Sequence, residues 1–211
     1  MTQRIDGVIL LDKPPAMSSQ SAVTAVKRHF KAEKAGHTGT LDPLATGLLP
    51  VCLGEATKYS QDLLNADKTY QATLHFGIET DTADADGQII SQKSMTEPID
   101  DDKARHLIET ILPQFVGQIN QTPPMYSALK RDGKPLYEYA RSGVELEREP
   151  RQITIYSIQL LSMSWPYASI EVHCSKGTYI RVLAQDIGQS LGCGAHLHAL
   201  RRTAVGHLTL D

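Results

Sequence analysis

Cysteine is scarce in this sequence. Its 211 residues include three cysteines, Cys52, Cys174 and Cys193, and none stands in a CxxC or CxxH spacing. An odd number of scattered cysteines is typical neither of a disulfide framework nor of a cysteine-based zinc site. We therefore expect reduced thiols and a cytoplasmic protein.

Long apolar runs are also lacking. No uninterrupted apolar stretch approaches the ~20 residues that a transmembrane helix requires, so we expect no membrane partner. The first seven residues lack the basic and then apolar regions of a signal peptide. The composition, 41% hydrophobic and 21% charged, is typical of a globular protein that is long enough to bury a sizeable core.

Several catalytic and metal-binding signatures are missing too. The sequence has no G-x-S-x-G nucleophile motif and no glycine-rich phosphate loop. The acidic segment 80–87 lacks the glycine spacing and the closing glutamate of a calcium loop. His196 and His198 would point the same way on a strand. No third ligand stands at a suitable spacing, so a structural role is favoured and we expect no metal.

The net charge and the distribution of charge give opposite indications about whether the protein binds nucleic acid. A net charge of −3 argues mildly against such a partner, because nucleic-acid-binding domains are usually basic. Positive charge is nevertheless gathered in three segments, residues 27–34, residues 130–134, and the pair Arg201 and Arg202. A separate basic surface that contacts phosphates is therefore compatible with the composition.

Apolar periodicity and turn residues predict a chain of mixed strands and helices. The first predicted strand is a nearly continuous apolar run, so we expect it to be buried. The predicted strands are 5–11, 48–53, 69–77, 125–130, 151–163, 167–174 and 205–210, and the predicted helices are 18–31, 55–66, 100–112, 135–143 and 180–191. Strict βαβ alternation is absent. This favours an α+β fold with a mixed, largely antiparallel sheet flanked by helices.

The segment 36–50 has an unusual layout for a soluble domain. Asp42 is its one carboxylate, and the residues around it are mostly apolar or glycine. Pro43 follows directly and disfavours the α conformation at Asp42. Taken alone, this pattern favours an ordinary turn whose aspartate caps a helix.

Three residue types could nevertheless form a catalytic set. Asp42 in a stiff loop could act as a nucleophile, Tyr70 at a strand start as a stacking surface, and Arg181 entering a helix as a counter-ion. A two-carboxylate glycosidase that uses Asp42 and a residue of the segment 81–86 is an alternative.

Seven blocks of the sequence stand in order over essentially the whole chain. They are Asp12-Lys13-Pro14 with Ser18-Ser19, GHTGTLDPLATGLLPVCLGEATK (36–58), Lys68-Thr69-Tyr70, DTADADG (81–87), PPMYSALKRDGKPLYEYAR (123–141), CSKGTYIR (174–181) and Leu200-Arg201-Arg202. Together they resemble the bacterial TruB family, the tRNA pseudouridine-55 synthases. The resemblance implies a pseudouridine-synthase-like fold with a central active-site cleft, and it reverses the reading of Asp42 as a simple cap.

The resemblance also implies roles for individual residues. Asp42 matches the catalytic aspartate, Tyr70 the tyrosine that stacks on the target base, and Arg181 the arginine that pairs with that aspartate. Four further residues match substrate-binding positions: His37 the histidine inserted where the extruded nucleotides had been, Asp84 a carboxylate that contacts the flipped nucleotide, and Tyr179 and Leu200 residues that line the uracil pocket. Lys13 lies in a motif packed near the site, with a structural role and RNA contact both open.

The implied activity is isomerisation of uridine-55 in the T loop of tRNA to pseudouridine. It proceeds by base flipping and attack of Asp42, either at C6 of the base or at the sugar. The reaction is neither a redox reaction nor a net hydrolysis, so we expect no cofactor. The expected partner is the tRNA T stem-loop, bound by a monomer that requires no protein partner. The alternative is a non-catalytic RNA-binding protein, a tRNA-folding chaperone on the same scaffold.

Members of the family generally continue into a small C-terminal RNA-binding domain, often of PUA type. We expect residues 1–211 to form the pseudouridine synthase catalytic domain, with the PUA-type domain absent from this chain. Weaker tRNA affinity with an intact catalytic centre is the expected consequence.

Overall fold

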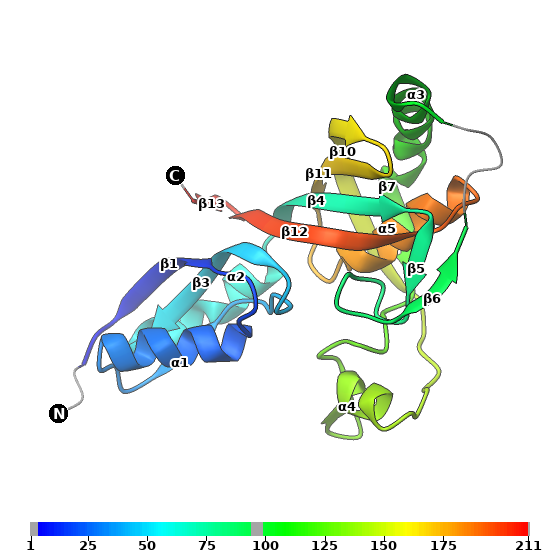
Figure 1. Cartoon of the computed structure of the whole chain (residues 1–211). Coiled ribbons are helices and arrows are strands. Elements are labelled where there is room, and N and C mark those ends of the chain that lie inside the picture. The colour runs from blue at the N-terminus through cyan, green and yellow to red at the C-terminus, as the bar shows by residue number, and fades with distance from the viewer. Residues whose placement is uncertain (1–3, 94–98, 211) are drawn as a thin grey trace. The chain divides into compact units, whose positions relative to one another are not determined.

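A computed structural model describes residues 4–93 and 99–210. Residues 1–3, which belong to the stretch without signal-peptide features, lie outside the described residues. The chain forms two compact units (Figure 1). Unit 1 comprises Met1–Gln71 and Leu200–Asp211, and unit 2 comprises Ala72–Ala199. Two strands, β4 (Lys68–Phe76) and β12 (Ala195–Val205), continue from one unit into the other.

Unit 1 is built on strand β3, which accepts partners on both edges. β1 pairs with it antiparallel, from Gly7 opposite Leu53 to Lys13 opposite Gly47, and β2 pairs antiparallel with its second half. A part of β12 pairs in parallel with the start of β3. Apart from its parts of β4 and β12, unit 1 consists of β1 (Gly7–Lys13), α1 (Ser19–His29), β2 (Ala35–His37), β3 (Thr46–Leu53), a 3-10 turn η1 (Gly54–Tyr59), α2 (Ser60–Asn65) and β13 (Leu208–Thr209).

Helix α1 supplies one wall of the core of unit 1. The Ser18 side chain accepts a hydrogen bond from the backbone N–H of Ser21, as predicted for an N-cap. Val23 and Val26 are buried against a cluster that includes Leu49 and Val51 of β3. The helix thereby packs its apolar stripe on β2 and β3 and exposes its basic residues.

The first strand differs from the prediction in its burial. β1 exists, but its residues alternate between partly buried and exposed, with Val8 and Leu10 43% and 41% exposed. The prediction of a buried strand was therefore wrong. A continuous apolar run does not separate a buried strand from one that faces solvent on one side, because both satisfy strand propensity.

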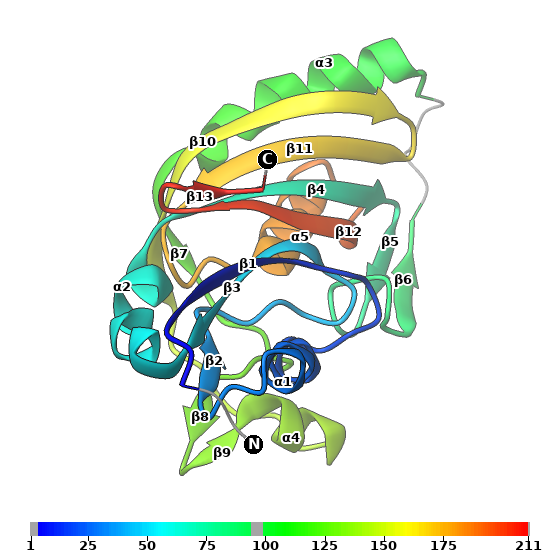
Figure 2. The same ribbon diagram turned by 90° about the vertical axis from the view of Figure 1, so that its left-hand side faces the viewer.

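Unit 2 contains a sheet ordered β12-β4-β11-β10-β7 and two separate two-stranded sheets, β5-β6 and β8-β9. Strands β10 and β11 form the predicted antiparallel pair, joined next to Trp165-Pro166, and β7 pairs antiparallel with β10. Helix α3 packs along β10 (Figure 2). Apart from its parts of β4 and β12, unit 2 consists of β5 (Ile78–Thr80), β6 (Ile89–Gln92), α3 (Asp101–Ile111), a 3-10 turn η2 (Leu112–Phe115), β7 (Gly117–Gln121), β8 (Lys130–Arg131), β9 (Lys134–Pro135), α4 (Leu136–Arg141), β10 (Arg151–Ser164), β11 (Tyr167–Cys174) and α5 (Ile180–Ser190).

Three predicted elements of the chain need correction. The segment 125–130 is not a strand over most of its length. Only Lys130 and Arg131, which form β8, are paired, and their partner is β9 on the other side of the Asp132-Gly133 turn. The predicted helix 55–66 is a 3-10 turn followed by the short α2. The predicted final strand 205–210 is instead the last residue of β12 (Ala195–Val205), a turn, and the short β13 (Leu208–Thr209). The α+β class with a mixed, largely antiparallel arrangement is confirmed. Among the described residues, none of the helices is both long and apolar enough to cross a membrane.

Gly47 permits the close approach of β3 and β12. Its φ is +95°, and a Cβ atom there would lie 2.2 Å from the carbonyl oxygen of Arg202. We expect Gly47→Ala to lower the free energy of unfolding by about 3 kcal/mol, since strain and overlap add. Urea denaturation measures this loss. The matched control is Gly36→Ala, because a Cβ at Gly36 meets nothing within 4 Å; an equal loss in both variants would contradict the assignment.

Candidate functional site

Asp42 lies in the loop 38–45, between β2 and β3, and no helix follows it. The loop is held at the residue before the aspartate. Ser19, in the first turn of α1, donates its hydroxyl to the carbonyl oxygen of Leu41 at 2.9 Å and accepts the Leu41 N–H at 2.8 Å. Both backbone groups of Leu41 are therefore satisfied by one buried side chain. Asp42 is thus presented from a fixed loop and is not a helix cap.

The residue after Asp42 is held from another direction by Lys13. This lysine ends β1 and is fully buried. Its ammonium donates to the carbonyl oxygens of Pro14 and Met17, at 2.9 and 2.7 Å, and reaches that of Pro43 at 3.4 Å. Burial lowers the pKa of Lys13, and the negative charge of Asp42 opposes this shift. Lys13 therefore has a structural role and places positive charge close to the aspartate.

Arg202 joins the same loop to strand β3. It is 1% exposed, and its guanidinium donates to the carbonyl oxygens of Leu48 at 2.8 Å and Gly39 at 3.1 Å. His37 stands just before the loop, at the end of β2. Burial, followed by the positive charge of Arg202, lowers the pKa of His37. The imidazole of His37 is therefore neutral at neutral pH.

Tyr70 and Leu200 pack against the same apolar cluster that flanks Asp42. This cluster includes Leu41 and Ala45, both buried, on either side of the aspartate. Tyr70 lies on β4 and Leu200 on β12, and each is partly exposed. The cluster thus connects three of the predicted site residues within unit 1, and His37 belongs to the same unit.

The remaining predicted site residues lie in unit 2, where Arg181 is the centre of a buried polar network. It stands in the first turn of α5 and is 5% exposed. Its guanidinium donates to the carbonyl oxygens of Thr82 at 2.9 Å and Tyr126 at 2.7 Å, and one nitrogen lies 3.6 Å from the carboxylate of Asp84. Two chain segments far apart in sequence therefore fix the direction of this guanidinium.

Asp84 is buried, and its carboxylate is bonded to other groups of the protein. Its carboxylate accepts the hydroxyl of Thr82 at 2.6 Å and the N–H of Asp86 at 3.1 Å, in addition to its ion pair with Arg181. The neighbouring backbone is tied to β12 by a bridge between Asp84 and Leu197. The acidic loop 80–87 is thus a folded support for Arg181.

Tyr179 precedes α5 and is fixed through its backbone. The amide of Gln121, at the end of β7, accepts the N–H of Tyr179 at 2.7 Å and donates to its carbonyl oxygen at 3.1 Å. Gln121 is itself buried. This two-point contact sets the position from which the Tyr179 side chain leaves the chain.

The basic segments do not all serve the same purpose. Arg202 is buried, and Arg201 forms a two-point ion pair with Asp12 at 2.9 and 2.8 Å. The interpretation of this pair as a phosphate contact was therefore wrong for Arg202 and is weak for Arg201. The basic residues of α1, of the turn that follows it and of strand β8 are exposed and stay candidates; they are Lys27, Arg28, Lys31, Lys130 and Arg131.

The structure thus gathers the predicted residues into two groups. Unit 1 holds His37, Asp42, Tyr70 and Leu200, and unit 2 holds Asp84, Tyr179 and Arg181. The pairing of Arg181 with Asp42 stays a prediction. Three positioning residues were not assigned these roles from the sequence, namely Ser19, Gln121 and Arg202. Ser19 and Arg202 stand inside the quoted blocks, whereas nothing in the sequence around Gln121 singles it out.

Solved structures share this fold. One chain of a Cbf5-Nop10-Gar1 complex matches with a TM-score of 0.73 and 35% sequence identity, over 97% of this chain and 50% of that chain. A chain in the structure of an H/ACA RNP bound to a substrate RNA containing 2'-deoxyuridine matches with a TM-score of 0.70 and 33% identity, over 97% and 49%. The fold is that of the pseudouridine synthases.

Sequence comparison specifies the family. The model of the TruB family pseudouridylate synthase N-terminal domain matches residues 27–180, and that of the tRNA pseudouridylate synthase B C-terminal domain matches residues 181–211. The tRNA pseudouridine synthase B of Burkholderia lata is 59% identical over 98% of this chain and 62% of its own length. That of Dechloromonas aromatica is 58% identical over 99% of this chain and 68% of its own length. The chain belongs to the TruB family, and it spans about two thirds of the length of these relatives.

Removal of the Ser19 hydroxyl tests the fixed loop. Ser19→Ala leaves the buried N–H and carbonyl of Leu41 without this partner, so we expect the free energy of unfolding to fall by about 1–3 kcal/mol. Urea denaturation measures the change. Ser21→Ala is the matched control on the exposed side of α1, with an expected change below about 0.5 kcal/mol. Indistinguishable variants would show that Ser19 does not hold the loop.

The ion pair in unit 2 makes a second prediction. Asp84→Asn removes a carboxylate that lies 3.6 Å from the guanidinium of Arg181. The buried ion pair then loses one of its two charges, so we expect a loss of about 3 kcal/mol in the free energy of unfolding. Asp86→Asn, an exposed site in the same loop, should be close to neutral. A neutral Asp84→Asn variant would contradict the supporting role of this carboxylate.

Proposed function

We propose that this chain isomerises uridine-55 in the T loop of tRNA to pseudouridine, with Asp42 as the nucleophile. The observation that carries the proposal is a single carboxylate in a loop whose flanking residues are both held by buried side chains, Ser19 and Lys13. Membership of the TruB family and similarity to proteins named tRNA pseudouridine synthase B support the choice of reaction and substrate.

Amino-acid side chains can meet most of the chemical requirements of this reaction. The bond between C1' of the ribose and N1 of uracil breaks, the base rotates, and a bond between C1' and C5 forms. The proton at C5 is lost and N1 gains one, so atoms and electrons balance without an oxidant or a hydrolytic water. The enzyme needs an ionised nucleophile that attacks either the base at C6 or the sugar, and it must hold the base while it turns.

The other site residues are assigned the roles that binding an extruded base requires. Extrusion costs a few kcal/mol, and stacking on Tyr70 returns ~1–3 kcal/mol. Leu200 packs against the same apolar cluster as Tyr70 and, with Tyr179, is assigned to the wall of the uracil pocket. His37 is neutral and next to the loop, which suits insertion into the space the nucleotides leave. We assign Arg181 as the counter-ion of Asp42 on the basis of the family resemblance.

The proposed partner is the T stem-loop of tRNA, bound in part through phosphate contacts. The exposed basic residues of α1 and of the β8–β9 hairpin are the candidates for these contacts, because Arg202 is engaged inside the protein. A binding constant that falls with rising salt concentration is the expected signature.

The direct test replaces the nucleophile. Asp42→Asn has almost the same shape but cannot attack, so we expect the rate of tritium release from C5-labelled uridine in tRNA to fall at least about a thousandfold. Asp62→Asn, on the exposed face of α2, makes the same charge change away from the site and should keep the wild-type rate. Turnover retained by Asp42→Asn would refute the assignment.

Product analysis and binding separate this proposal from its alternatives. Free uracil or free sugar would indicate a glycosidase, whereas pseudouridine in intact tRNA indicates an isomerase. Wild-type protein that binds tRNA and promotes its folding, yet releases no tritium, would indicate the tRNA-folding chaperone. We expect Asp42→Asn to bind tRNA with close to wild-type affinity, because the substitution removes chemistry and leaves the basic surfaces unchanged.

A further inference from the structure

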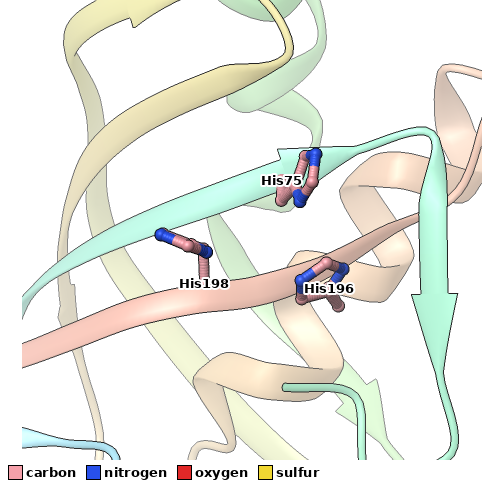
Figure 3. Close-up of side chains that lie close together, drawn as sticks. All are labelled: His75, His196 and His198. Carbon is pink, nitrogen blue, oxygen red and sulfur yellow. The ribbon is translucent and has the colours of Figure 1, made fainter. Parts of the chain in front are cut away.

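Three histidines of unit 2 meet on two neighbouring strands of its sheet. His196 and His198 lie two residues apart on β12, and His75 lies on β4, the next strand in the sheet. Figure 3 shows the three side chains close together, one from β4 and two from β12. Each offers one ring nitrogen such that the three atoms lie within 4.8 Å of one another. The third ligand that sequence spacing did not reveal is therefore supplied by the fold.

His196 has its tautomer set by a contact with the backbone. Its Nδ1 lies 2.9 Å from the carbonyl oxygen of Ile78, so in the neutral ring Nδ1 carries the proton and donates it. Nε2 then keeps its lone pair. Metal-bound histidines usually make such a hydrogen bond through the nitrogen that is not coordinated, because it fixes the ring orientation and makes the other nitrogen a better ligand. The arrangement at His196 matches this pattern.

The surroundings of the other two rings also suit a cation-binding role. His75 is half-buried and His198 is exposed, so the cluster has an opening to solvent. Burial, followed by the proximity of His196 and His198, lowers the pKa of His75. Tyr167 stacks on His75 with ring centroids 4.4 Å apart and covers that ring from one side. A neutral imidazole has one unprotonated ring nitrogen, so three rings that face one another can offer three lone pairs to one shared ion.

We propose that His75, His196 and His198 bind one first-row transition-metal ion of the zinc type. Imidazole ligands suit Zn²⁺, Cu²⁺ and Ni²⁺ and disfavour Mg²⁺ and Ca²⁺, which take oxygen ligands. Zinc–nitrogen bonds of about 2.0–2.1 Å in a tetrahedron place ligand atoms ~3.4 Å apart. Side-chain rotation closes the gap from the observed limit of 4.8 Å. Three protein ligands leave the fourth position for water or another ligand.

The ion would connect β4 to β12 through side chains. Both strands leave unit 2 to enter unit 1, where they carry Tyr70 and Leu200. We assign the ion a structural role on these two strands.

The test is a titration of the metal-free protein with ZnCl₂. The full chain is prepared without a polyhistidine tag and treated with a chelator, and heat on binding is measured at pH 7.5. We expect one Zn²⁺ per chain and at least about tenfold weaker binding in His198→Ala. His198 is exposed, so this variant is expected to fold, which circular dichroism checks. His106→Ala, which removes an exposed histidine of α3, is the matched control and should bind as wild type.

Two further readouts decide the nature of the site. Co²⁺ in place of Zn²⁺ should give visible absorption bands of a tetrahedral complex in wild type and His106→Ala, and lose them in His198→Ala. Binding at pH 5.5 should be weaker than at pH 7.5, because protons compete for the imidazole nitrogens. Absence of saturable Zn²⁺ binding, or equal binding by His198→Ala and wild type, would overturn the proposal and leave an aromatic packing cluster.

Discussion

A buried ammonium group holds the part of unit 1 on which the proposed chemistry depends. Lys13 is fully buried at the end of β1 and bonds to backbone carbonyls on two separate loops. A lysine is costly to bury unless its charge is compensated. Here the carbonyl dipoles and the charge of Asp42 provide the compensation. The aspartate and the lysine therefore stabilise one another's charged forms, and the loop between β2 and β3 gains its fixed shape as a consequence.

The two groups of predicted site residues, one in each unit, are supported in the same way. In each group, a buried polar side chain satisfies backbone groups at or next to a predicted site residue: Ser19 does so next to Asp42, and Gln121 does so at Tyr179. Arg181 is positioned in turn by two carbonyl oxygens. Because these hydrogen bonds lie within the protein, they fix the backbone beside Asp42 and at Tyr179 without any substrate.

Local patterns in the sequence were sufficient where one face or one cap decides the structure. The alternation along β4, the paired runs of β10 and β11, and the cap at Ser18 each follow from neighbouring residues. Local patterns failed where a strand is defined by pairing with residues that are distant in the sequence. The segment 125–130 has strand-forming residues but almost no partner strand, and β12 begins earlier than its composition indicates because it joins β4 and β3. The family resemblance supplied the candidate site residues, but not Gln121, whose role exists only once β7 and α5 meet.

Unit 1 is discontinuous in sequence, because residues 72–199 lie between its two parts. The guanidinium of Arg202 closes the loop of Asp42 across sequence separations of 154 and 163 residues. A ribosome makes these partners many seconds apart, at roughly 5–20 residues per second. The contiguous unit 2 has all its strands, apart from the start of β4 and the end of β12, within one uninterrupted stretch. During synthesis, the loop that carries the proposed nucleophile therefore lacks the contact between Gly39 and Arg202 until 163 further residues have been added.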